Sequence, residues 1–132
     1  MSDLAAGRAA QGEFRILVVD DDPDMAGFLV RLLQQQGLQA EVAANGHAAL
    51  QRIAAAPPDL VLLDVLMPGP SGFDICRHLK SNEATALTPV ILVTALEDQE
   101  SRVRGIEAGA DAYITKATFD QKHLLDIIRR FI

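Results

Sequence analysis

The chain has 132 residues, of which 49% are hydrophobic, enough for one compact domain and too few for two. Its formal charge is −6, with 18 acidic and 12 basic residues, and no dense run of Lys or Arg suggests direct binding of nucleic acid. A single cysteine, Cys76, excludes a disulfide framework, and no apolar run approaches the roughly 20 residues of a membrane span, so we expect a cytoplasmic protein that does not contact a membrane.

The first residues show no periodic pattern. We interpret residues 1–13 as a flexible tail and 14–132 as the folded domain. Phe14–Val19 is an apolar run that predicts a strand covered on both faces. An amphipathic helix is predicted next, with Asp22 as its N-cap and Gly37 just beyond its end.

Strands and helices alternate through the rest of the domain. The further strands predicted are an edge strand at Leu38–Ala43, in which apolar and polar residues alternate, then Leu60–Leu63, Val90–Val93 and Ala112–Thr115. The further helices predicted are Gly46–Ala55, Gly72–Lys80, Asp98–Ala108 and a last one capped by Asp120. Five strands alternating with five helices indicate an α/β fold with a parallel sheet. Right-handed crossovers favour the order 2-1-3-4-5, that of flavodoxin-like (βα)5 three-layer sandwiches.

Polar residues that could take part in chemistry stand at the ends of four of these strands. Asp20 and Asp21 follow the first, Asp64 the third, Thr94 ends the fourth and Lys116 follows the fifth. Singly, each has an ordinary explanation as a turn residue, a strand end or a surface amine. Together they lie where such sheets bind ligands, beyond the carboxyl ends of the strands. Three carboxylates gathered there repel one another unless a cation neutralises them.

A hard divalent cation resolves that repulsion. Mg²⁺ takes one or two carboxylates together with waters and phosphate oxygens, so Asp21 and Asp64 suit direct ligation and Asp20 suits ligation through water. One oxygen of Asp64 then stays available as a nucleophile toward phosphorus. The metal, the Lys116 ammonium and the Thr94 hydroxyl can meet the charge of the transferring group. The pattern therefore predicts a Mg²⁺-dependent phosphoryl acceptor, Asp64.

Four segments resemble the response-regulator receiver family of two-component signalling. They are Ile16–Pro23, Asp59–Gly69, Pro89–Ala95 and Glu107–Lys116. The resemblance covers residues 14–132 and implies that a histidine kinase donates the phosphoryl group to Asp64. It also implies that the Leu66 carbonyl joins Asp20, Asp21 and Asp64 at the metal.

The resemblance also implies a switch. Thr94 shifts toward the phosphate and Tyr113 turns inward, which biases the face made by the fourth helix, fifth strand and fifth helix. That face then controls a downstream protein or effector domain, or forms a phosphorylation-dependent homodimer. Outside this family, Tyr113 reads as an ordinary edge-strand aromatic. Such a domain is regulatory and catalyses only its own phosphorylation and dephosphorylation.

Three residues depart from the family pattern. Ala117 follows Lys116 where the family usually has a proline, often after a cis peptide. Because a non-proline cis bond costs roughly 2.5–4 kcal/mol, we predict a trans peptide and a displaced Lys116 loop. Leu66 and Leu96 stand where amide or acidic side chains assist hydrolysis in relatives, and neither leucine can orient a water. We therefore predict slow self-dephosphorylation.

Two other functions compete with this interpretation. Asp20-Asp21-Asp22 contains the Asp-x-Asp of haloacid-dehalogenase-like phosphatases, but the late acidic pair of those enzymes is absent and Asp64 would have no role. An interaction domain that keeps the fold without the switch is the second alternative, and the intact acidic set argues against it. Gly69–Gly72 lacks the Lys-Ser/Thr of a nucleotide-binding P-loop, so we expect no nucleotide cofactor. The sequence names neither the cognate kinase nor the output.

Overall fold

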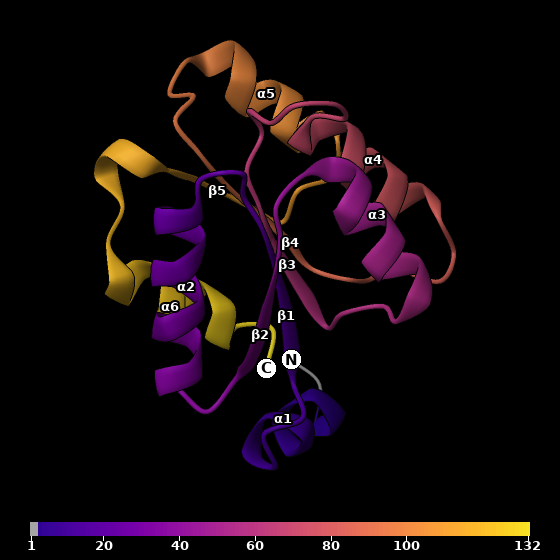
Figure 1. Ribbon diagram of the computed structural model, residues 1–132, viewed down its shortest axis with the longest axis vertical. Helices are drawn as coiled ribbons and strands as arrows, with labels where there is room; N and C mark the ends of the chain where they lie inside the picture. The colour runs from indigo at the N-terminus through magenta and orange to yellow at the C-terminus, as the bar shows by residue number, and fades with distance from the viewer. Residues whose placement is uncertain (1–2) are drawn as a thin grey trace.

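Five parallel strands form one sheet in the order β2-β1-β3-β4-β5 (Figure 1). The computed structural model describes residues 3–132. The strands are β1 (Arg15–Val19), β2 (Gln39–Ala43), β3 (Leu60–Leu63), β4 (Val90–Thr94) and β5 (Ala112–Thr115). The helices are α1 (Asp3–Ala10), α2 (Pro23–Gln35), α3 (Gly46–Ala55), α4 (Gly72–Ser81), α5 (Gln99–Glu107), the 3-10 turn η1 (Lys116–Thr118) and α6 (Gln121–Arg129). The predicted fold class, strand order and edge position of the second strand are confirmed.

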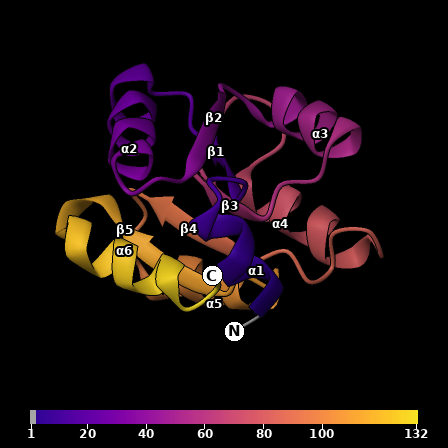
Figure 2. The ribbon, with the colours of Figure 1, turned by 90° about the horizontal axis from the view of Figure 1, so that it is seen from below.

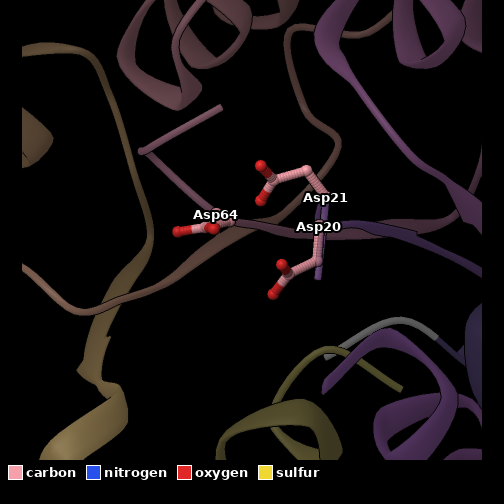
Figure 3. Close-up of side chains that lie close together, drawn as sticks. All are labelled: Asp20, Asp21 and Asp64. Carbon is pink, nitrogen blue, oxygen red and sulfur yellow. The ribbon is translucent and has the colours of Figure 1, made fainter. Parts of the chain in front are cut away.

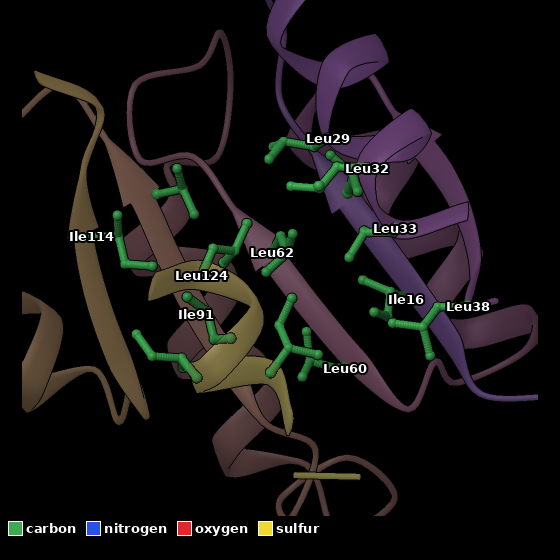
Figure 4. Close-up of a cluster of buried hydrophobic side chains, with 14 of the residues drawn as sticks. Ile16, Leu29, Leu32, Leu33, Leu38, Leu60, Leu62, Ile91, Ile114 and Leu124 are labelled. Atoms are coloured by element: carbon green, nitrogen blue, oxygen red, sulfur yellow. The ribbon is translucent and has the colours of Figure 1, made fainter. Parts of the chain in front are cut away.

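Helices cover both faces of the sheet, as Figure 2 shows in end view. On one face, α2 and α6 pack against Ile16 and Val18 of β1 (Figure 4). On the other face, α3 and α4 pack against Leu17 and Val19 of the same strand. Successive side chains of a strand point to opposite faces, so a strand buried on both sides needs an unbroken apolar run. This explains why β1, β3 and β4 lack polar alternation.

Two predicted N-cap residues mark where α2 and α6 begin. The Asp22 carboxylate accepts a hydrogen bond from the Asp24 backbone N–H at 3.0 Å, so α2 begins directly after the acidic run. The Asp120 carboxylate caps α6 in the same way, from Lys122 N–H at 3.0 Å. Gly37 follows α2 with φ of 77°, a conformation that favours glycine. All three boundaries agree with the sequence prediction.

The helix α1 corrects our expectation of a segment without regular structure. Ala9 packs against the core on the α2 and α6 face, and the Arg8 guanidinium forms an ion pair with the half-buried Asp59. The segment is rich in alanine, the best helix former, and gains these contacts when helical. It lies where β1 begins, at the end of the sheet away from Asp20 and Asp21 (Figure 1). Residues 1–2 lie outside the described residues, and the division into tail and domain stays a prediction.

The buried cysteine and the lengths of the helices complete the description of the fold. Cys76 is a free, fully buried thiol of α4 whose Sγ donates to the Ala108 carbonyl at 3.4 Å. Burial raises the pKa of this thiol to about 11, so the thiol stays protonated and unreactive near neutral pH. Across residues 3–132, no helix is both long enough and apolar enough to cross a membrane.

Candidate functional site

Three carboxylates gather at the carboxyl ends of β1 and β3 (Figure 3). One oxygen each from Asp20, Asp21 and Asp64 lies within 4.8 Å of the others. Neighbouring parallel strands produce this meeting, because Val19 of β1 pairs in register with Leu63 of β3. Asp20 and Asp64 are buried, whereas Asp21 is exposed to solvent.

The donors of this cluster fit a hard divalent cation. Asp64 Oδ1 is buried and has no hydrogen-bond partner among residues 3–132. A buried polar atom without a partner costs roughly 1–3 kcal/mol, so it calls for a ligand. Carboxylate oxygens are the ligands that Mg²⁺ prefers. The orphaned oxygen and the spacing of the three carboxylates therefore suit a metal at this end of the sheet.

Lys116 is the cation that the fold itself supplies to the cluster. Its Nζ lies 3.0 Å from Asp20 Oδ2 and 3.3 Å from Asp64 Oδ2. Burial lowers the pKa of this ammonium, but its hydrogen bond with Asp20 and the charge of Asp64 outweigh burial and leave the pKa above its ordinary value. Lys116 therefore stays protonated and offsets part of the negative charge.

The electrostatics of Asp64 are unfavourable to its charged form. Burial, followed by the charge of Asp20, raises the pKa of Asp64 above 3.8, and Lys116 only partly opposes this rise. The folded state thus binds the Asp64 proton more tightly than the unfolded state. The stability that this proton contributes to the fold is fully present below the pKa of Asp64 in the unfolded chain. It is lost as the pH rises through the pKa of Asp64 in the folded protein.

The raised pKa of Asp64 leads to a prediction for the stability of the metal-free protein. Asp64→Asn is expected to raise the free energy of unfolding near pH 7 in EDTA, because it removes a charge that the fold destabilises. The gain should shrink as the pH falls through the folded pKa of Asp64, because the wild-type carboxyl then becomes protonated. Urea unfolding across this range measures the gain, with the exposed Asp126→Asn as a control for charge removal. A gain that stays constant with pH would contradict the explanation.

Thr94 and Tyr113 meet at the loop after β4. Thr94 is fully buried at the end of that strand, and its hydroxyl accepts a hydrogen bond from the Leu96 N–H at 3.3 Å. Tyr113 donates its hydroxyl to the Leu96 carbonyl at 2.8 Å. Its ring lies against Gly105 of α5, where an added Cβ would stand 3.0 Å from it. Among residues 3–132 we find no hydrogen bond from the Thr94 hydroxyl to Asp64, so the two are linked only through their neighbouring strands.

A cleft of about 440 Å³ opens beside the carboxylates. Its wall includes Asp21, Leu66 and Leu96, and also Arg104 from α5. Leu66 is 53% exposed, so an apolar side chain faces solvent next to Asp64. The Arg104 guanidinium stacks 4.5 Å from the ring centre of Phe73. Arg104 was not among the predicted site residues, because only the fold brings α5 to this cleft.

The segment after β5 tests one departure from the family pattern. Within residues 3–132 no peptide bond is cis, so the predicted trans bond between Lys116 and Ala117 is confirmed. The chain forms the short turn η1 there. The displacement of the Lys116 loop relative to relatives stays a prediction.

Comparison with known proteins gives consistent matches. The family model of the response regulator receiver domain matches residues 16–129. The DNA-binding response regulator MtrA of Mycolicibacterium smegmatis is 41% identical over 87% of the chain and 49% of MtrA. Here the chain spans about half the length of the curated relatives it matches.

Two solved structures support the same assignment. The signal receiver domain of a signal transduction histidine kinase from Syntrophus aciditrophicus is 38% identical, with a TM-score of 0.83 over 89% of this chain and 88% of that one. The BeF3-activated DrrB receiver domain is also 38% identical, with a TM-score of 0.80 over 89% and 96%. At 38% identity, this chain resembles both structures in sequence as well as in fold.

Proposed function

The chain belongs to the response regulator receiver family, and on that premise we propose that Asp64 accepts a phosphoryl group from a histidine kinase. The observation that carries the proposal is the buried Asp64 carboxylate, with one oxygen unpaired and the other 3.3 Å from Lys116. A carboxylate held in this way has no evident packing role. It has a clear role as a nucleophile beside a bound cation.

The residues that would hold Mg²⁺ follow from their exposure and position. Asp21 and Asp64 would bind it directly, Asp20 through a water, and the Leu66 backbone carbonyl would complete the protein ligands. Bound Mg²⁺ supplies positive charge that neutralises the carboxylates and the incoming phosphoryl oxygens. Asp20 suits the indirect role, because its carboxylate already accepts from the Asp22 N–H and pairs with Lys116.

The transfer itself needs little covalent chemistry from the protein. An Asp64 oxygen forms the new O–P bond while the P–N bond of the phosphohistidine breaks, and the imidazole leaves with a proton from solvent. The Lys116 ammonium, already within 3.3 Å of Asp64, contacts a phosphoryl oxygen. The Thr94 hydroxyl, which accepts from the Leu96 N–H, donates its own hydrogen to another such oxygen. Positioning and charge therefore account for the chain's contribution.

The signal would leave the site through the loop that Thr94 and Tyr113 share. If Thr94 moves toward the phosphoryl group, Leu96 moves with it and changes the acceptor of the Tyr113 hydroxyl. Tyr113 then biases the equilibrium between two conformations of the face made by α5, β5 and α6. These are the fourth helix, fifth strand and fifth helix of the predicted domain. We propose that this face controls a partner, an effector domain or a homodimer in the cytoplasm.

The test uses acetyl phosphate as the phosphodonor. Wild-type protein with Mg²⁺ is expected to gain the mass of one phosphoryl group, and borohydride trapping should locate it on Asp64. EDTA should prevent the gain. Modification on Asp20, or steady release of phosphate that Asp64→Asn leaves intact and Asp20→Asn abolishes, would favour the phosphatase instead. No modification by any phosphodonor would favour the interaction domain without a switch.

We also expect the phosphorylated state to be long-lived. Leu66 and Leu96 line the cleft next to Asp64, and neither side chain can hydrogen-bond a water for attack on phosphorus. Leu66→Asn supplies an amide that can, so it should shorten the phosphoryl lifetime several-fold. Decay of the phosphorylated mass after removal of the donor measures this, with Leu66→Met as the apolar control. Rapid decay of the wild type that Leu66→Asn leaves unchanged would contradict the prediction.

A further inference from the structure

The turn that carries Lys116 has little backbone structure to hold it. η1 is a single 3-10 turn of three residues, and its closing bond, from Phe119 N–H to the Lys116 carbonyl, is long at 3.4 Å. Short 3-10 turns have poor hydrogen-bond geometry. Ala117 does not fix φ, as a proline at that position does. Something else must keep the turn closed if Lys116 is to stay on Asp20 and Asp64.

A side-chain hydrogen bond closes the same turn. The hydroxyls of Thr115 and Thr118 lie 2.6 Å apart. Thr115 is only 3% exposed and pairs in register with Thr94 of β4, so its position is fixed by the sheet. Thr118 is an exposed residue of η1. The bond therefore ties the far end of the turn to a rigid strand.

The residues after the turn anchor only its exit. The Phe119 ring packs edge-on against Phe28 of α2, with 5.8 Å between ring centres. This contact holds the chain where α6 begins. Among the described residues, the side-chain anchors between Thr115 and Phe119 are the Lys116 ammonium and the threonine pair.

We propose that Thr118 is a positioning residue for Lys116, acting through its hydroxyl bond to Thr115. With the turn closed, the Lys116 backbone leaves β5 at a fixed angle, and its ammonium reaches Asp20 Oδ2 and Asp64 Oδ2 at 3.0 and 3.3 Å. Without the bond the turn opens and the ammonium spends more time in solvent. The effect on phosphoryl transfer rests on the proposed function, whereas the effect on the position of Lys116 does not.

The test compares Thr118→Val, which removes the hydroxyl but keeps the shape, with Thr118→Ser, which keeps the hydroxyl. Trace acylation of lysines in metal-free protein, read by peptide mass spectrometry, reports how often the Lys116 amine is free. We expect Lys116 in Thr118→Val to react about 3- to 10-fold faster, and Thr118→Ser to react like wild type. Lys80, paired with Asp111 where β4 and β5 begin, is the internal reference and should not change.

Phosphorylation by acetyl phosphate at saturating Mg²⁺ gives the second readout. Thr118→Val should slow it by a similar factor, and the valine should have no further effect when Lys116→Met is already present. Unchanged labelling of Lys116, equal increases in the valine and serine variants, or an equal increase at Lys80 would each overturn the proposal. Wild-type protein that takes no phosphoryl group would instead refute the proposed function, and the labelling would still decide the role of Thr118.

Discussion

Asp64→Asn protein is expected to take up no phosphoryl group from acetyl phosphate at any Mg²⁺ concentration that allows full modification of the wild type. The amide that replaces the carboxylate is neutral and a poor nucleophile. It offers no anionic oxygen that could form the bond to phosphorus. The side chain keeps its volume at a position that is 5% exposed, so the fold should be retained. Intact mass after incubation measures the loss.

The same substitution should also remove most of the stabilisation by Mg²⁺. A ligand that binds only the folded state at about 100 times its Kd adds about 2.7 kcal/mol to the free energy of unfolding. Asp64 contributes the orphaned oxygen of the cluster, so thermal unfolding of Asp64→Asn should respond far less to Mg²⁺. Asp126→Asn removes an exposed carboxylate of α6 and should behave like wild type in both assays. Full modification or full Mg²⁺ stabilisation of Asp64→Asn would rule out the proposed acceptor.

Local patterns in the sequence were sufficient to predict the five strands and the five α-helices of residues 14–132. Asp22 and Asp120 each precede an amphipathic stretch. An N-cap carboxylate accepts hydrogen bonds from backbone N–H groups two or three residues later, so a cap can be predicted from neighbouring residues alone. The apolar runs of β1, β3 and β4 predict burial on both faces for the same local reason. Because parallel strands end at one edge, the gathering of Asp20, Asp21 and Asp64 also followed from the predicted strand order.

Contacts between distant segments could not be predicted in the same way. The helix α1 gains its stability partly from Arg8 and Asp59, 51 residues apart, so its own composition showed only a segment without pattern. The stacking of Arg104 on Phe73 depends on how α5 packs beside α4. The link between Thr115 and Thr118 spans three residues, but it became visible only once the turn was known to be 3-10. Each depends on tertiary geometry that no local period encodes.

Gly72→Ala is expected to be the most damaging of the conservative substitutions in this domain. Gly72 opens α4 and donates its N–H to the Val65 carbonyl at 3.0 Å. A Cβ there would overlap the Asp64 carbonyl oxygen and lie 2.7 Å from Val65 Cα. Both are backbone atoms, so no side chain can rotate away. We expect a loss of about 3 kcal/mol or more in the free energy of unfolding, measured by urea unfolding.

The damage should reach the site, because the colliding backbone belongs to Asp64 itself. Whatever folded Gly72→Ala protein remains must move α4 away from β3, or shift Asp64 relative to Asp20 and Asp21, and either change should weaken Mg²⁺ binding. Gly27→Ala is the matched control: it lies inside α2, and its added Cβ would come no closer than 3.4 Å to a side-chain nitrogen of Arg31. Relief of glycine's conformational entropy should there raise stability by up to about 1 kcal/mol. If Gly72→Ala were as stable as Gly27→Ala and bound Mg²⁺ like wild type, close approach of α4 could not be what fixes Asp64.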